Sequence, residues 1–170
     1  ERGPELDERV KAVEHFEKTG ELNLNANIQF GEGGAGTFSD GKLTTRVGDP
    51  LCAFVTDAFL QHGAPADIAW RQKPHVGTDL LRGIIRSIRQ EIIALGGEVR
   101  FNTALTGLKI ENGALASVET TAGDFACEQL ILAVGHSARD TFAMLEAQSI
   151  ALEPKPFAMG VRIEHLQSQI

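Results

Sequence analysis

Apolar residues recur at helical spacing in several separate segments of the chain. Residues 5–18 alternate acids and bases with apolar side chains, and Gly20 follows at a position typical of a helix end. The pattern predicts further helices over 51–61, 78–95 and 138–146. Of these, the 78–95 segment has the most continuous apolar stripe, so we expect it to pack on a sheet.

The ends of the 78–95 helix carry their own signals. Thr78 can cap its start, and Gly96 is placed to end it. The stripe consists of seven large aliphatic residues: Leu80, Leu81, Ile84, Ile85, Ile88, Ile92 and Leu95.

The residues after this helix have the pattern of strands. Residues 98–101 follow a Gly-Gly turn, and the apolar run 130–135 is typical of a strand buried on both faces of a parallel sheet. Between them, two turn sequences, Glu-Asn-Gly and Ala-Gly-Asp, separate alternating strands expected at 104–110, 114–121 and 125–127. The sequence therefore predicts an α/β fold in which two parallel-type strands bracket an antiparallel meander.

The composition narrows the classes of function. A length of 170 residues with 42 % hydrophobic and 23 % charged residues is typical of one globular domain. The net charge of −7 argues against nucleic acid or an acidic membrane as a partner. Cys52 and Cys127 lie far apart, which favours a reducing compartment, the cytoplasm, and provides no metal site. No apolar run reaches the length of about 18 residues that a membrane span needs.

The densest chemical signal is a glycine-rich run in which five glycines fall within the eleven positions 31–41. Glycine lets backbone N–H groups approach an anionic ligand closely. Gly31, Gly33 and Gly36 match G-x-G-x-x-G by spacing, with Asp57 as the acid downstream. The residues that follow have turn chemistry rather than the helix that a dinucleotide fingerprint opens.

Two other interpretations of the run stay open. Residues 36–42 match the first seven positions of a P-loop, but Leu43 occupies the place of the magnesium-binding hydroxyl and Thr44 comes one residue late. The run could also be a glycine-rich surface loop that holds no ligand.

The order of the elements, together with four sequence blocks, resembles a known family. The blocks are 30–43, 73–79, 135–142 and 155–165, and Ala-Val-Gly at 133–135 stands where related proteins have Ala-Thr-Gly. They are similar to an uncharacterised bacterial family of FAD-dependent dehydrogenases, within the glutathione-reductase-like flavoproteins that have two dinucleotide folds.

The resemblance implies part of a parallel-sheet, Rossmann-like FAD-binding domain with an antiparallel three-strand β-meander and inserted helices. It divides the chain into an FAD-contacting segment at 1–49, a substrate-side or inserted helical segment at 50–96, a strand, meander and buried strand at 97–137, and a helix leading into the substrate domain at 138–170. It also implies an internal fragment, because the main pyrophosphate loop would precede Glu1. We therefore expect the isolated fragment to bind FAD weakly or not at all.

The same resemblance implies a set of cofactor contacts. Glu1 stands where an acid bonds the ribose hydroxyls, and the glycine-rich loop would approach the pyrophosphate and the flavin edge. Lys42 either places a positive charge near flavin N1 and C2=O or is an ordinary solvated lysine. The implied contacts are Glu1, Arg2, Gly31, Gly33, Gly34, Ala35, Gly36, Thr37, Phe38, Ser39, Asp40, Gly41, Lys42, Leu105, Ala133, Gly135 and His136.

The candidates for catalysis are Lys42, His75 and His136. His136 follows the apolar run directly and could donate a proton to a ligand, or it could make only a local contact beside Ser137. We expect the other three histidines on the surface: His15, His62 and His165.

The implied chemistry is hydride or electron transfer through the flavin of an FAD-dependent oxidoreductase. NAD(P)H is a candidate electron donor, and the small-molecule substrate or acceptor is not identified by any motif. Disulfide reduction is disfavoured because no cysteine lies between Glu1 and Leu51. The competing interpretation is a non-catalytic scaffold or interaction domain whose glycine-rich loop holds no cofactor.

Overall fold

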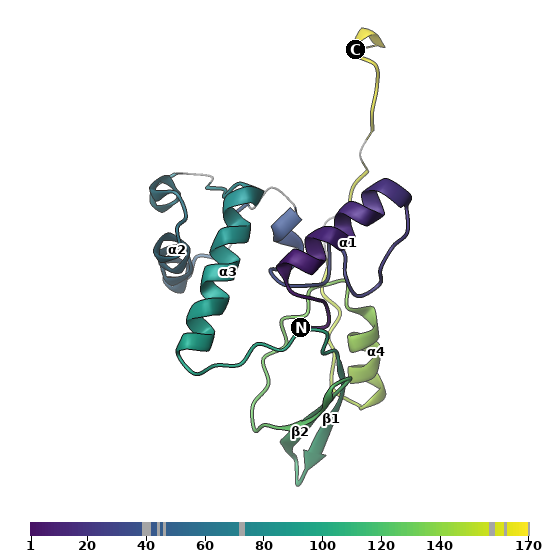
Figure 1. Cartoon of the computed structure of the whole chain (residues 1–170). Coiled ribbons are helices and arrows are strands. Elements are labelled where there is room, and N and C mark those ends of the chain that lie inside the picture. The colour runs from purple at the N-terminus through teal and green to yellow at the C-terminus, as the bar shows by residue number, and fades with distance from the viewer. Residues whose placement is uncertain are drawn as a thin grey trace.

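The computed structural model describes residues 1–38, 42–43, 45, 47–71, 74–156, 159–161 and 163–169. In this part of the chain, Figure 1 shows a helical half with α2 and α3 and a second region where the β-hairpin lies beside α4. The helices are α1 (Leu6–Thr19), α2 (Leu51–Gln61), α3 (Thr78–Ala94) and α4 (Arg139–Ala147), with short 3-10 helices η1 (Ala35–Phe38), η2 (Ala66–Ala69) and η3 (Gln167–Gln169).

All four predicted helices are confirmed, with ends within a residue or two of those expected. Gly20 ends α1 in the left-handed conformation, with φ of 77°, and its N–H donates to the carbonyl of Phe16 at 2.8 Å. The expected cap of α3 is wrong: the N-cap is Gly77, no side chain caps it, and Thr78 is the first helical residue. Gly96 follows α3 with φ of 88°, as a helix end requires.

The predicted three-strand meander is also confirmed. Strands β1 (Leu105–Glu111), β2 (Ala114–Thr120) and β3 (Gly123–Ala126) form one antiparallel sheet in the order β1-β2-β3. Asn112 and Gly113 take φ of 51° and 79° between β1 and β2, which is the geometry that a tight hairpin turn needs. Just after α4, the side-chain amide of Gln148 bonds both backbone groups of Leu108 in β1, at 3.0 and 3.2 Å, and so ties α4 to the sheet.

The predicted parallel, Rossmann-like sheet is wrong. Among the described residues the sheet is antiparallel, and neither 98–101 nor 130–135 forms a strand. A strand buried on both faces needs a bonded neighbour on each side and a cover over both faces. The 130–135 run has neither in this part of the chain, and Ile131 is 92 % exposed. In residues 98–101, the carbonyl of Arg100 accepts a hydrogen bond from the amino group of Glu1, and no regular secondary structure is formed.

The apolar stripe of α3 packs on helical segments. The expectation that it would pack on a sheet is therefore wrong. Leu81 and Ile84 from α3 form a buried core with Ile68 of η2 and with Val76. Side chains from α2 and its flanks pack against the same core: Phe59, Leu60 and Ala64. At the C-terminal end of the stripe, Leu95 is 80 % exposed, so the described part of the chain leaves it largely uncovered.

His62 links α2 to α3 and is not the surface residue that the sequence suggested. Its side chain is 11 % exposed. Nδ1 lies 2.8 Å from the Ser87 hydroxyl, and Nε2 lies 2.7 Å from a carboxylate oxygen of Glu91. Both ring nitrogens therefore have partners on α3. The expectation holds for His15 and His165, which are exposed.

None of the helices in the described ranges combines the length and the apolar character that crossing a lipid bilayer requires. The division of the chain into four functional segments, with boundaries near residues 49, 96 and 137, stays a prediction.

Candidate functional site

The N-terminal residues lie against the segment that precedes β1. The backbone N–H of Thr103 donates to the carbonyl of Glu1 at 2.8 Å, and that of Asn102 donates to Gly3 at 2.9 Å. The amino group of Glu1 donates to the carbonyl of Arg100 at 2.9 Å. These bonds bring together two segments about a hundred positions apart, and a pocket opens beside them.

This pocket has a volume of about 620 Å³, within the range of about 300–1,000 Å³ typical of small-molecule sites. We call it the N-terminal pocket. Its walls come from six parts of the chain: residues 1–2, 28–30, 34–35, 103–105, 131–138 apart from Leu132, and Thr141 in α4. Most of its lining is apolar, and polar residues such as Glu1, Arg2 and His136 also contribute to it.

The N-terminal pocket gathers many of the residues that the family resemblance implied. Eight of the proposed cofactor contacts line it: Glu1, Arg2, Gly34, Ala35, Leu105, Ala133, Gly135 and His136. Six others do not line it: Gly31, Gly33, Gly36, Thr37, Phe38 and Lys42. The remaining three, Ser39, Asp40 and Gly41, lie outside the described residues.

The glycines among the implied cofactor contacts include two kinds. Gly31 and Gly33 face their own chain: a Cβ would lie 2.4 Å from Cδ of Arg9 at Gly31, and 2.3 Å from the Thr37 hydroxyl oxygen at Gly33. Gly34 and Gly135 line the pocket with φ of 65° and 74°, and a Cβ there would meet no atom within 4 Å. The backbone at these two positions is open to a ligand, so the pocket has room there for a cofactor to approach.

Arg9 bonds the backbone of residues that lead into and begin the glycine-rich loop. The side chain projects from α1 and is fully buried. Its Nη1 donates to the carbonyl of Glu32 at 2.5 Å and, more weakly, to the hydroxyl of Thr37 at 3.4 Å. Nε and Nη2 donate to the carbonyls of Asn27 and Ile28, each at 2.9 Å. A single guanidinium thus holds three backbone carbonyls in place.

The Arg9 guanidinium keeps its charge at neutral pH. Burial lowers the pKa of Arg9 to about 10, and the carboxylates of Glu1 and Glu32 oppose that shift. The ring of Phe38 lies 4.8 Å from the guanidinium carbon and covers one of its faces. Thr37 and Phe38 therefore have structural partners, which explains why neither lines the pocket.

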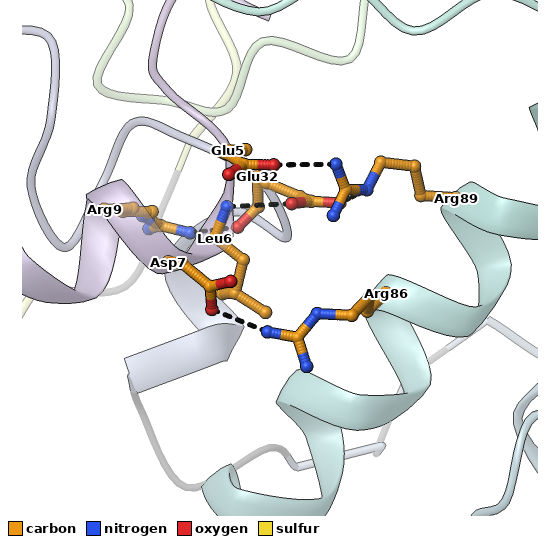
Figure 2. Close-up of polar contacts among 7 residues, drawn as sticks. All are labelled: Glu5, Leu6, Asp7, Arg9, Glu32, Arg86 and Arg89. Carbon is orange, nitrogen blue, oxygen red and sulfur yellow. Dashed lines mark hydrogen bonds and ion pairs between the residues drawn. The ribbon is translucent and has the colours of Figure 1, made fainter.

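Glu32 connects the loop to two helices, as Figure 2 shows. One carboxylate oxygen accepts from the backbone N–H of Leu6 in α1 at 2.8 Å. The other lies 2.9 Å from Nε of Arg89 in α3. Arg89 also bonds Glu5 at 2.9 Å, while Arg86 bonds Asp7 at 2.6 Å nearer the surface. The loop is therefore held between α1 and α3.

Glu1 holds the same loop from the pocket side. Its Oε1 accepts from the backbone N–H groups of Gly3 at 2.8 Å and Gly31 at 3.1 Å. The predicted ribose-binding acid therefore lines the pocket while one of its oxygens fixes the loop backbone.

Lys42 and His75, two of the catalytic candidates, lie beside each other. They form an isolated antiparallel bridge, and the N–H of Leu43 donates to the carbonyl of Pro74 at 3.0 Å. Both residues are exposed, and neither lines the N-terminal pocket. Of the three catalytic candidates, His136 lines this pocket.

His136 lies at the rim of the pocket. Its Nδ1 is 3.3 Å from the hydroxyl oxygen of Ser137, which also lines the pocket. His136 can therefore contact Ser137 through Nδ1 and a ligand in the pocket at the same time, so the two roles that the sequence left open are compatible.

Arg2 places a positive charge in the pocket wall. Its guanidinium lies over the ring of Phe30, 4.6 Å from the centroid, and bonds the carboxylate of Asp140 in α4. The hydrogen bond from Arg2 lowers the pKa of Asp140 below its ordinary value, and the weaker effect of burial opposes it.

This pair predicts a pH dependence of stability. Because the pKa of Asp140 is lower in the folded state, its stabilisation is complete above the ordinary pKa of 3.8 and is lost as the pH falls through the folded value. We expect Asp140→Asn to lower the free energy of unfolding at pH 7 by about 0.5 kcal/mol, since the carboxylate is largely exposed. Urea unfolding from pH 7 to pH 2.5 checks this, and a difference that does not shrink in acid would contradict it.

Sequence reasoning missed several residues that shape the site. Arg9 was signalled by its position between Leu6 and Val13, three and four residues away on the buried face of α1. Thr103 and Thr141 line the pocket and carry no sequence signal that sets them apart. In the described part of the chain, no three His, Cys, Asp or Glu side chains gather closely enough to hold a metal ion.

Comparison with known proteins adds one relative and no family. The chain is 52 % identical over all 170 residues to an uncharacterized protein of Clostridium beijerinckii. The matched region is 100 % of this chain but 32 % of the relative, so the chain spans about a third of that protein's length. No family model matches the sequence.

Proposed function

We propose that this chain contributes a flavin-contacting site to an FAD-dependent oxidoreductase. The observation that carries the proposal is the convergence of eight implied cofactor contacts, from separate parts of the chain, on one pocket of about 620 Å³. Nothing in the local sequence pattern requires Glu1, Gly34, Leu105 and Gly135 to meet. The open backbone at Gly34 and Gly135 gives a planar or phosphorylated ligand room to approach.

The chain's own residues would bind and orient the cofactor. When bound, FAD supplies the capacity to accept and release a hydride or electrons. Apolar side chains of the pocket, such as Leu105 and Val134, would exclude water from the ring system. His136, with Ser137 beside it, is placed to hold or move a proton at Nδ1 or Nε2. NAD(P)H as the electron donor and the cytoplasm as the location stay proposals that the sequence suggested.

A second candidate function is the scaffold or interaction domain. It is favoured by Gly31 and Gly33, whose lack of a side chain is explained by packing against Arg9 and Thr37 without any ligand. The two candidates differ in one property, because only the oxidoreductase needs flavin in the N-terminal pocket.

A pair of tryptophan variants tests the proposal in the protein at its natural length. Ala133→Trp would fill the pocket, whereas Ala151→Trp places the same side chain on an exposed residue outside it. We expect Ala133→Trp to weaken FAD binding by roughly tenfold or more, equal to about 1.4 kcal/mol, and Ala151→Trp to leave it unchanged. Titration with FAD, followed by flavin fluorescence, measures both. Equal affinities in the two variants would place any flavin elsewhere and contradict the proposal.

A further inference from the structure

Arg2 is the one arginine or lysine among the described residues that line the N-terminal pocket. Its side chain is 16 % exposed. The Phe30 ring, which also lines the pocket, lies against one face of the guanidinium at 4.6 Å. The charge is therefore held in a fixed plane at the pocket wall instead of moving freely in solvent.

Most of the hydrogen-bonding capacity of Arg2 is unused within the described part of the chain. A guanidinium has five N–H donors. One nitrogen, Nη2, donates to the carboxylate of Asp140, and no other acceptor is found for the group among the described residues. The Asp140 side chain is 64 % exposed, so it can turn into solvent without opening the fold.

We propose that Arg2 is the receptor for a phosphate group of the pocket's ligand, and that Asp140 is the internal carboxylate that this phosphate replaces. The identity of the ligand as a flavin rests on the proposed function, whereas the position of the Arg2 charge in the pocket wall does not. A phosphate offers the guanidinium a planar pair of oxygens and up to two negative charges, so it competes well with a single exposed carboxylate. The pocket would then prefer a phosphorylated aromatic compound to its dephosphorylated form.

FMN and riboflavin test this preference, because they differ by one phosphate. With the protein at its natural length, we expect FAD and FMN to bind more tightly than riboflavin. Arg2→Gln should weaken FMN and FAD binding by roughly tenfold and leave riboflavin unchanged. Asp140→Asn should strengthen FMN binding severalfold, since it removes the competing carboxylate and keeps Arg2. Arg86→Gln is the matched control: it also breaks an arginine–aspartate pair, but outside the pocket, and should change none of the affinities.

The outcomes separate this inference from the flavin proposal. If flavins bind but the ratio of FMN to riboflavin affinity is the same in the parent and in Arg2→Gln, the Arg2 inference is overturned and the flavin proposal stands. If no flavin binds but ADP binds in a manner that depends on Arg2 and is strengthened by Asp140→Asn, the flavin proposal fails and the inference stands. If neither flavins, ADP nor inorganic phosphate binds, both are overturned. Should Arg2→Gln not fold, the Asp140→Asn arm decides by itself, because its effect on FMN has a predicted sign.

Discussion

Replacing Arg9 with methionine is expected to lower the free energy of unfolding by about 3–5 kcal/mol, the range for breaking a buried charged network. Methionine keeps much of the length and apolar stem of the side chain but donates no hydrogen bond. The buried bond to the carbonyl of Glu32 and the part-buried bonds to the carbonyls of Asn27 and Ile28 would be lost together. A buried acceptor left unsatisfied costs about 1–3 kcal/mol. Urea denaturation followed by circular dichroism measures the change.

Arg86→Met is the control for this prediction. Arg86 also pairs with an acid, Asp7, but the two side chains are 40 % and 64 % exposed. Exposed pairs contribute about 0.2–1 kcal/mol, so this variant should stay close to the parent. Equal losses in Arg9→Met and Arg86→Met would show that the buried guanidinium does not hold the glycine-rich loop.

Gly31→Ala is expected to lower the free energy of unfolding by about 2–4 kcal/mol, from strain at positive φ together with overpacking. The residue has φ of 118°, and the new Cβ would lie 2.4 Å from Cδ of Arg9. Arg9 cannot withdraw without giving up its bonds to the loop carbonyls. The same denaturation experiment measures the loss.

Gly36→Ala is the matched control in the same loop. Gly36 does not have the positive φ of Gly31, and a Cβ there would meet no atom within 4 Å. We expect its stability to lie within about 0.5 kcal/mol of the parent, as for ordinary surface substitutions. If Gly31→Ala proves as mild as Gly36→Ala, the close packing of the loop on Arg9 is wrong.

The elements that the sequence predicted correctly depend on local signals. Gly20 ends α1 and Gly96 follows α3 because both adopt a left-handed backbone that glycine favours. The hairpin between β1 and β2 turns at Asn112 and Gly113, whose positive φ angles are a property of those two residues. Such signals need no knowledge of distant parts of the chain.

The parallel sheet failed as a prediction because strand pairing is not local. An apolar run such as 130–135 shows that a segment could be buried, but it does not provide the neighbouring strands that would bury it. The same limit applies to α3, whose stripe identifies a face to be covered and does not say whether a sheet or another helix covers it. Ile68 and Val76 provide that cover.

The site was predictable only in part. The spacing from Leu6 and Val13 places Arg9 on the buried face of α1, but an arginine is rarely buried without partners. The loop carbonyls that serve as its partners could not be placed around it from any sequence pattern. The family resemblance named Glu1, Leu105 and Gly135 as cofactor contacts, but it did not predict the pocket that all three line in the folded chain. Arg2 was named as a cofactor contact, but its bond to Asp140 follows only from the folded chain.

The most direct test of the account is the absorbance spectrum of the protein at its natural length, purified and then titrated with FAD. We expect flavin bands in the purified protein, or a change in the absorbance bands of added FAD, and we expect Ala133→Trp to reduce either effect. A colourless protein that leaves the FAD spectrum unchanged would contradict the flavin site, and the scaffold function would take its place.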